Sequence, residues 1–182
     1  MDTPLQRNDV DVVDRAEYRA VVRTIMFSDV VDSTSYAEVN GDLSFVRLLD
    51  EHDRIVQSVA VDAGGQYVKG TGDGAMLAFV DPCDAVEAAV DVQRKALAAA
   101  IPLRVGLDHG PVIESRNGDY RGLIANIAAR LSSMAAAGEV VATDRVILAA
   151  QLAGPTRPCS IRGVRMRQRV RTYAVAASAP SI

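Results

Sequence analysis

The feature that most limits the fold is a glycine-rich turn at residues 70–74, with the sequence Gly-Thr-Gly-Asp-Gly. Short segments at residues 66–69 and 75–80 flank this turn, and the second segment is almost entirely apolar. An Asp-Gly pair favours the positive φ angles of tight turns, so the two segments are expected to pair as a β-hairpin with Asp73 at its tip. The chain must therefore build a sheet that contains an antiparallel pair.

Apolar patterns predict further strands and helices around this hairpin. Residues 21–27 are rich in β-branched side chains and predict a buried strand, while residues 43–61 carry a helical apolar stripe that stops at Gly64. Pro82 opens an alanine-rich helix that runs to about residue 100. The remaining expected elements are two strands either side of Gly110 (103–108 and 111–114), a helix (123–137), a strand (139–142), a helix (144–152) and a strand pair (160–175). This order favours an α+β fold, an antiparallel-rich sheet with helices packed on one side.

The length of 182 residues fits one domain. We expect an arm or linker end at 1–20, the domain at 21–177 and a short tail at 178–182. No apolar stretch approaches the ~20 residues of a membrane span, and the polar, acidic start does not resemble a signal peptide. The two cysteines, Cys83 and Cys159, lack metal-ligand or disulfide spacing, which suits a reducing compartment. A cytoplasmic protein without a membrane span is expected.

Charge and aromatic content limit the possible partners. The formal net charge of −3 argues against a general nucleic-acid binder, which needs a basic excess. An RNA-binding sheet would need exposed aromatic side chains, and the chain holds only three phenylalanines and five tyrosines. Positive charge gathers near the end, where alternate arginines of a strand would form either a solvated edge or a basic stripe: Arg165, Arg167, Arg169 and Arg171.

Two aspartates fall where strands end. Asp29 follows the first strand and Asp73 lies at the hairpin tip, so neighbouring strands would bring both carboxylates to one edge of the sheet. Such a pair repels itself unless a cation neutralises it, and Mg²⁺ is commonly held by one or two carboxylates plus substrate phosphates. The alternative is that Asp29 caps a helix and Asp73 is only a turn residue, which the spacing alone favours.

The segment after Asp29 adds a second ligand-binding signal. Asp32, Ser33 and Thr34 are polar caps for a helix start. Free backbone N–H groups at such a start can hold a phosphate.

Four segments in order resemble the motifs of class III nucleotidyl cyclases. The resemblance runs from about Thr24 to Tyr173 and rests on residues 27–34 (FSDVVDST), 69–76 (KGTGDGAM), 104–110 (RVGLDHG) and 118–122 (GDYRG) followed by Asn126 and Arg130. It implies the class III cyclase fold with a ferredoxin-like core. It also implies a head-to-tail homodimer whose two active sites each use residues of both chains.

The resemblance also implies roles for individual residues. Asp29 and Asp73 of one subunit would bind two divalent cations, Mg²⁺ or Mn²⁺, with Ser33 and Thr34 at the substrate phosphates. In the other subunit, Lys69 and Asp119 would read the purine, Asn126 would orient the ribose, and Arg130 would stabilise charge on the reacting phosphate. Arg104 is a further phosphate contact. Arg162 stands where the family often has a lysine for the terminal phosphate.

The chemistry of the base supports ATP as the substrate. Adenine presents an acceptor at N1 and a donor at N6, which match Lys69 and Asp119, whereas guanine presents the reverse. The expected function is therefore adenylyl cyclase, which converts ATP to 3′,5′-cyclic AMP and pyrophosphate. The alternatives are a catalytically silent cyclase-like module, a guanylate cyclase or a diguanylate cyclase. His52, expected on a polar helix face, and His109, expected in a strand turn, are not needed as bases, because a metal can activate the hydroxyl.

Overall fold

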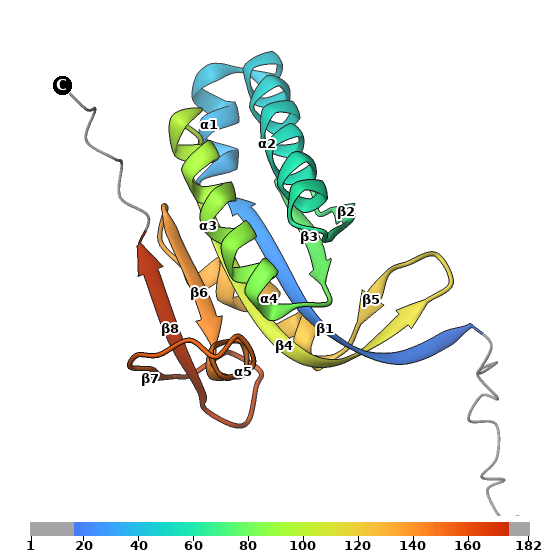
Figure 1. Ribbon diagram of the computed structural model, residues 1–182. Helices are drawn as coiled ribbons and strands as arrows, with labels where there is room; N and C mark the ends of the chain where they lie inside the picture. The colour runs from blue at the N-terminus through green and yellow to red at the C-terminus, as the bar shows by residue number, and fades with distance from the viewer. Residues whose placement is uncertain (1–16, 175–182) are drawn as a thin grey trace, which may run out of the picture.

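The computed structural model describes residues 17–174, which form one sheet with helices on both of its faces (Figure 1). The strands are β1 (Tyr18–Val30), β2 (Gln66–Gly70), β3 (Gly74–Phe79), β4 (Leu103–Ser115), β5 (Tyr120–Arg121), β6 (Glu139–Thr143), β7 (Arg157–Cys159) and β8 (Gln168–Ala174). The helices are α1 (Ser33–Asn40), α2 (Asp42–Asp62), α3 (Pro82–Ala98), α4 (Leu123–Met134) and α5 (Asp144–Ala149). The predicted α+β class is confirmed.

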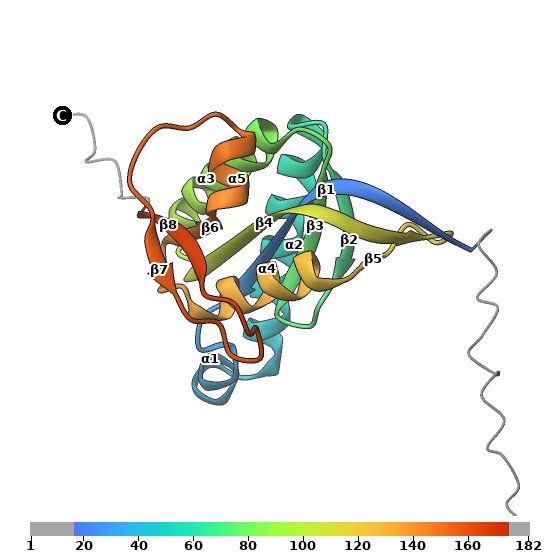
Figure 2. The same ribbon diagram turned by 90° about the horizontal axis from the view of Figure 1, so that it is seen from below.

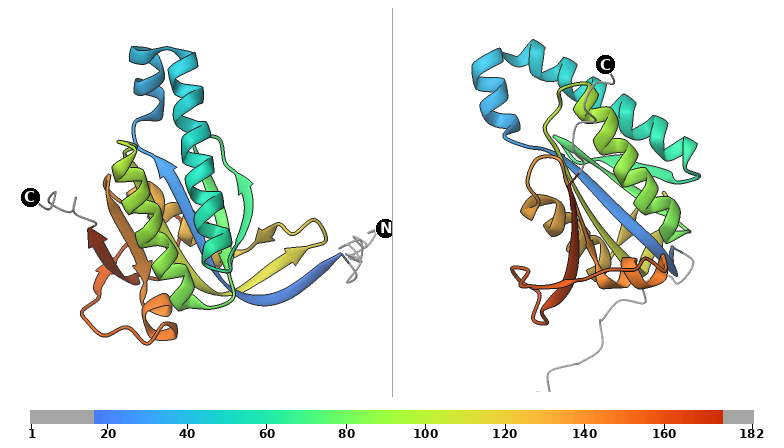
Figure 3. Two further views of the ribbon diagram at one scale, coloured as in Figure 1. Left: turned by 45° about the horizontal axis from the view of Figure 1, so that its top comes forward. Right: turned by 60° about the vertical axis from the view of Figure 1, so that its left-hand side comes forward.

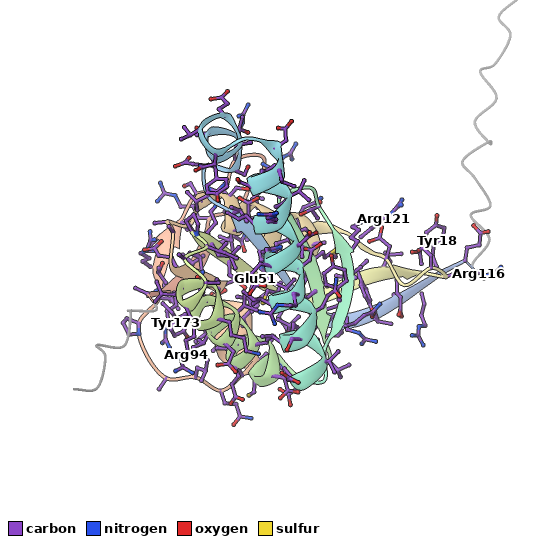
Figure 4. The ribbon with its side chains drawn as sticks, turned by 90° about the horizontal axis from the view of Figure 1, so that it is seen from above. Tyr18, Glu51, Arg94, Arg116, Arg121 and Tyr173 are labelled. Atoms are coloured by element: carbon purple, nitrogen blue, oxygen red, sulfur yellow. The ribbon has the colours of Figure 1, made fainter. Side chains whose placement is uncertain are left out.

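The sheet is built around two long central strands. Its order is β2-β3-β1-β4-β6-β8-β7, with β5 paired to β4, and every pairing except β4–β6 is antiparallel. β1 and β4 pair along their whole length, from Tyr18 opposite Ser115 to Val30 opposite Leu103. Their outer ends, together with β5, extend beyond the helices as a projecting arm (Figure 3). Tyr18, Arg116 and Arg121 all lie on this arm (Figure 4).

The helices divide between the two faces of the sheet. One apolar core joins Met26 and Val105 to residues of α2, α3 and α5, while a second core joins Ile25 and Met76 to α4. Figure 2 shows α3 and α5 on one side of the strands and α4 on the other. The expectation that all the helices pack on one side of the sheet was therefore wrong. Successive side chains of a strand point to opposite faces of the sheet. Because β1 carries apolar residues at consecutive positions, it buries both of its faces.

Helix α4 lies so close to the sheet that only glycine fits beneath it. A Cβ atom at Gly106 of β4 would overlap the backbone of α4 at Ala128 and Ser132. Close packing of this kind requires a residue without a side chain. Gly106 thus fixes the height of α4 above the strands, and with it the position of the polar side chains along that helix.

Several local expectations differ from the structure. The strands expected either side of Gly110 are one continuous strand, β4, because long-range pairing with β1 overrides the local turn signal of Gly110 and Pro111. The strand pair expected at 160–175 starts earlier, as β7, and its second strand begins only at Gln168. Arg165 and Arg167 consequently lie outside β8, so the four arginines form no single strand face.

The limits of the predicted domain fall partly beyond the described residues. β1 begins at Tyr18, inside the segment expected as an arm, while most of that arm and the whole of the tail at 178–182 lie outside residues 17–174. Within the described part of the chain, no helix has the length and apolar character that crossing a membrane requires.

Candidate active site

Asp29 and Asp73 meet at the end of β1. Asp29 pairs with Gly74 in the β1–β3 register, and the Val30 amide donates to the Asp73 carbonyl at 3.0 Å. A Cβ atom at Gly74 would overlap the Ser28 carbonyl, so the glycine that follows Asp73 is required by the close approach of two strands. The two aspartates therefore lie at one edge of the sheet, as expected.

Arg104 lies directly opposite Asp29 and is bonded to its carboxylate. The Nε atom of Arg104 donates to Asp29 Oδ2 at 2.6 Å, and Nη1 donates to the Ser133 carbonyl at the end of α4 at 2.9 Å. Burial raises the pKa of the Asp29 carboxyl, Arg104 opposes this rise, and the nearby Asp73 charge adds to it. The site therefore concentrates negative charge that Arg104 balances only in part.

The start of α1 contacts the pair formed by Asp29 and Asp73. Ser33 is buried, and its hydroxyl donates to Asp73 Oδ2 at 2.5 Å, while Thr34 beside it is exposed. Asp32 takes the N-cap position in a left-handed conformation without a capping hydrogen bond from its side chain. Of the three polar residues expected to cap this helix, Asp32 takes the N-cap position but makes no side-chain capping hydrogen bond, and Ser33 bonds Asp73.

The donor set at this edge fits a hard cation only in part. Between Glu17 and Ala174, no cluster of three or more His, Cys, Asp or Glu side chains is arranged to hold a metal ion. Two carboxylates alone supply too few ligands for Mg²⁺, which completes its shell with water and phosphate oxygens. Asp29 and Asp73 thus suit a cation that arrives with a phosphate ligand.

A second group joins β2 to the turn between β4 and β5. Lys69 Nζ donates to Asp119 Oδ1 at 2.7 Å, and the Tyr120 amide donates to the same oxygen at 2.9 Å. Burial raises the pKa of the Asp119 carboxyl, but Lys69, the Tyr120 amide and Arg121 outweigh it, so the pKa lies below its ordinary value. The two residues predicted to read a purine are therefore in direct contact as an ion pair.

The third group lies along α4. Asn126 and Arg130 are exposed and four residues apart, which places them on one face of the helix. The Arg130 guanidinium donates to the backbone carbonyl of Arg162. Arg162 thus meets Arg130 through its main chain, while its own side chain is exposed.

Sequence reasoning missed the buried polar groups beside these residues. His52 is buried, at 2% exposure, and not on a polar face as expected; its Nε2 lies 3.0 Å from Ser28 Oγ. His109 lies within continuous β4, with Nδ1 2.9 Å from Thr24 Oγ1. Beside Lys69 and Asp119, the structure adds a hydrogen-bonded set to which the motifs gave no role, although Tyr120 lies within residues 118–122: Gln66, Glu114 and Tyr120.

Comparison with known proteins identifies the family of this chain. The family model described as the adenylate and guanylate cyclase catalytic domain matches residues 14–177. An uncharacterized protein of Mycobacterium tuberculosis is 38% identical over 124 residues, which cover 67% of this chain. The match covers 32% of that relative, so the chain aligns with about a third of its length. The chain belongs to the adenylate and guanylate cyclase catalytic domain family.

Solved structures of both activities share the fold. The guanylyl cyclase Cya2 superposes with a TM-score of 0.76 at 19% identity, covering 90% of this chain and 96% of that one. The adenylyl cyclase CyaB from P. aeruginosa gives a TM-score of 0.74 at 21% identity, covering 91% and 99%. The predicted class III cyclase fold is confirmed, and both nucleotide specificities occur among the neighbours.

Proposed function

We propose that this chain is an adenylyl cyclase that converts ATP to 3′,5′-cyclic AMP and pyrophosphate. Membership of the cyclase family supports the reaction type, and the Lys69–Asp119 pair at 2.7 Å supports the choice of ATP. That pair is the single observation on which the substrate assignment rests.

The pair presents a donor and an acceptor side by side. Lys69 would donate to N1 of adenine, and Asp119 would accept from the N6 amino group. Asp119 Oδ1 accepts from Lys69 and the Tyr120 amide, whereas Oδ2 lies 3.6 Å from the Arg121 guanidinium and is the oxygen that would accept from the base. Guanine would set its N1–H against Lys69 and its O6 against Asp119, and each mispaired buried group costs about 1–3 kcal/mol.

The reaction is an in-line displacement at the α-phosphorus. The ribose 3′-oxygen forms a bond to this phosphorus, the bond to the bridging oxygen of the β-phosphate breaks, and the 3′-hydroxyl proton passes to solvent. When held by Asp29 and Asp73, two divalent cations, Mg²⁺ or Mn²⁺, supply a lowered pKa for that hydroxyl and charge neutralisation for the leaving group. These carboxylates lie at the end of β1, where the nucleotide phosphates would complete the ligand shell.

The remaining residues position the nucleotide and its charge. Arg130 would donate to the oxygens on which negative charge grows, and Asn126, one turn earlier, would orient the ribose. Phosphates would lie near Ser33 and Thr34 at the start of α1, with Arg104 as a further phosphate contact. Arg162 is assigned to the terminal phosphate through its exposed side chain.

We further propose that the active site is shared between two copies of the chain. The metal-binding group would come from one protomer, while Lys69, Asp119, Asn126 and Arg130 would come from its partner in a head-to-tail homodimer. The exposure of Asn126 and Arg130 on α4 supports this, because both side chains lie at the surface, where a second copy could meet them.

The test is a product assay with purified protein, ATP or GTP, and Mn²⁺ or Mg²⁺. The proposal expects cyclic AMP from ATP and a kcat/KM for GTP at least about a hundredfold lower, since two mispaired groups act together. A protein that binds nucleotide but makes neither cyclic product would instead be a silent regulatory module. Predominant cyclic GTP would overturn the assignment of Lys69 and Asp119.

A further inference from the structure

The turn that carries Asp119 is fastened to the strand that carries Lys69 by a second set of contacts. Gln66 of β2 donates from Nε2 to the Gly118 carbonyl at 3.3 Å, and its Oε1 lies 3.0 Å from the Tyr120 hydroxyl. Gln66 stands three residues before Lys69, and Tyr120 directly follows Asp119. The second set of contacts therefore joins a residue on the strand of Lys69 to a residue beside Asp119.

The Tyr120 side chain is held firmly at its other contacts. Tyr120 is 3% exposed, its ring packs in the core that α4 covers, and the Arg23 guanidinium lies 5.9 Å from the ring centre. The hydroxyl also lies 3.1 Å from Glu114 Oε1, while Arg19 occupies Glu114 Oε2 at 2.6 Å. A hydroxyl has one proton, so Tyr120 donates to either Gln66 or Glu114 at any moment.

The turn itself has its own internal bonds but needs an anchor. The Ser115 amide donates to the Asp119 carbonyl at 2.9 Å, and the Gly118 amide donates to the Ser115 carbonyl at 2.9 Å. These bonds shape residues 115–119, yet they do not set where the turn lies relative to β2. The contacts across that gap come from Lys69 to Asp119 and from Gln66 to Gly118 and Tyr120.

The two links differ in how well they resist water. Lys69 has 45% of its side chain exposed, so its ion pair alone is a weak constraint on geometry. The Gln66–Tyr120 link is partly buried, because Tyr120 is 3% exposed although Gln66 is exposed, and a hydrogen bond at the buried hydroxyl constrains position more strongly. Lys69 must also be free to turn toward a base, which a partner fixed by other contacts permits.

We propose that Tyr120 and Gln66 are positioning residues for purine choice. They hold the Asp119 turn at the distance from β2 at which Lys69 and Asp119 together match the N1 and N6 edge of adenine. This inference rests on the proposed function, since it concerns how the same site selects ATP. Both residues would act through Asp119 and its turn, and not through a contact of their own with the nucleotide.

The test measures kcat/KM for ATP and for GTP in Tyr120→Phe and in Gln66→Met. Tyr120→Phe keeps the buried ring and removes only the hydroxyl, whereas Gln66→Met keeps the length of an exposed side chain. The loss of one positioning hydrogen bond should reduce the ATP-to-GTP preference about three- to tenfold in each variant. Tyr173→Phe, which removes a hydroxyl from β8, is the matched control and should keep the wild-type preference.

The ratio separates positioning from simple damage. A variant that is only less stable loses active protein for both nucleotides alike, so its ATP-to-GTP ratio would stay at the wild-type value. An unchanged ratio in both variants, with a wild type that prefers ATP, overturns this inference and leaves the proposed function standing. A wild type that makes no cyclic nucleotide, or prefers GTP, overturns the proposed function and this inference with it.

Discussion

Arg104 of β4 donates from Nε to Asp29 Oδ2 of β1 at 2.6 Å, and the two residues are direct partners in the strand register. The pairing couples Asp29, the proposed metal ligand, to the strand that also supports α4, because Arg104 bonds the Ser133 carbonyl as well. The Arg104 side chain thus contacts both the carboxylate of the candidate site and the end of α4.

Replacing Arg104 should separate metal affinity from catalysis. Arg104→Gln removes a positive charge beside Asp29, so Mn²⁺ should bind the nucleotide-free protein about fivefold more tightly. The rate of cyclisation should nevertheless fall about a hundredfold, because the proposed phosphate contact would be lost. Electron paramagnetic resonance of free Mn²⁺ measures the affinity, and product formation measures the rate. Weaker Mn²⁺ binding in the variant would contradict this role.

The purine-reading pair should invert when its charges are exchanged. Lys69→Glu alone sets two carboxylates together and should abolish activity with either nucleotide. The double variant Lys69→Glu, Asp119→Lys restores an ion pair and offers an acceptor to guanine N1–H and a donor to O6. We expect its ratio of kcat/KM values to shift toward GTP at least about tenfold relative to the wild type. A double variant that still prefers ATP would show that other residues choose the base.

The glycine after Asp73 should tolerate no side chain. Gly74→Ala would drive a methyl group into the Ser28 carbonyl and displace the Asp73 turn from β1, at a cost of about 1–3 kcal/mol in the free energy of unfolding. Gly70→Ala is the matched control, because its Cβ atom would meet nothing closer than 3.4 Å. Thermal unfolding of the three proteins tests this, and equal melting temperatures for Gly74→Ala and Gly70→Ala would refute it.

The buried histidine should make stability depend on pH. Burial lowers the pKa of His52 below its ordinary value of 6.5, although Asp53 acts in the opposite direction. As pH falls through about 6.5, the unfolded chain gains a proton that folded His52 refuses, so stability decreases on acidification. The pKa of His109 is also lowered, mainly by burial, and acts with the same sign.

His52→Gln should therefore flatten the dependence without removing it. Between about pH 7.5 and 5.5, the melting temperature of this variant should fall less steeply than that of the wild type, with His109 responsible for part of the remaining slope. Urea unfolding at several pH values gives the same comparison as a free energy. An identical slope in both proteins would contradict this prediction, because it would mean that folding does not shift the pKa of His52.

Much of the fold followed from local patterns, and the failures have physical causes. The hairpin around Asp73 was predictable because glycine turns and apolar strands are local signals. Two strands were predicted in place of β4, because Gly110 and Pro111 are typical of a turn. In the structure, β1 pairs with β4 along its whole length and keeps it continuous. His52 was placed on a polar face because its neighbours in sequence are charged, although α2 turns it toward Ser28.

The site was predictable only through the resemblance of its motifs. Lys69 and Asp119 are 50 residues apart, and no periodicity in the sequence links them. Gln66 and Tyr120, 54 residues apart, were given no role, because Gln66 lies outside the quoted motifs and Tyr120 stands inside one without an implied role of its own. Gln66 and Tyr120 meet because the turn between β4 and β5 lies beside β2.

The most direct test of the shared active site mixes two inactive variants. Asp73→Ala removes a proposed metal ligand and Arg130→Ala removes a proposed charge-stabilising donor, so each protein alone should be nearly inactive. In a head-to-tail dimer, random exchange leaves one intact site in each heterodimer, and the mixture should recover roughly a quarter of wild-type activity. A mixture that stays inactive, while native mass spectrometry detects the heterodimer, would contradict a site built from Asp73 of one chain and Arg130 of the other.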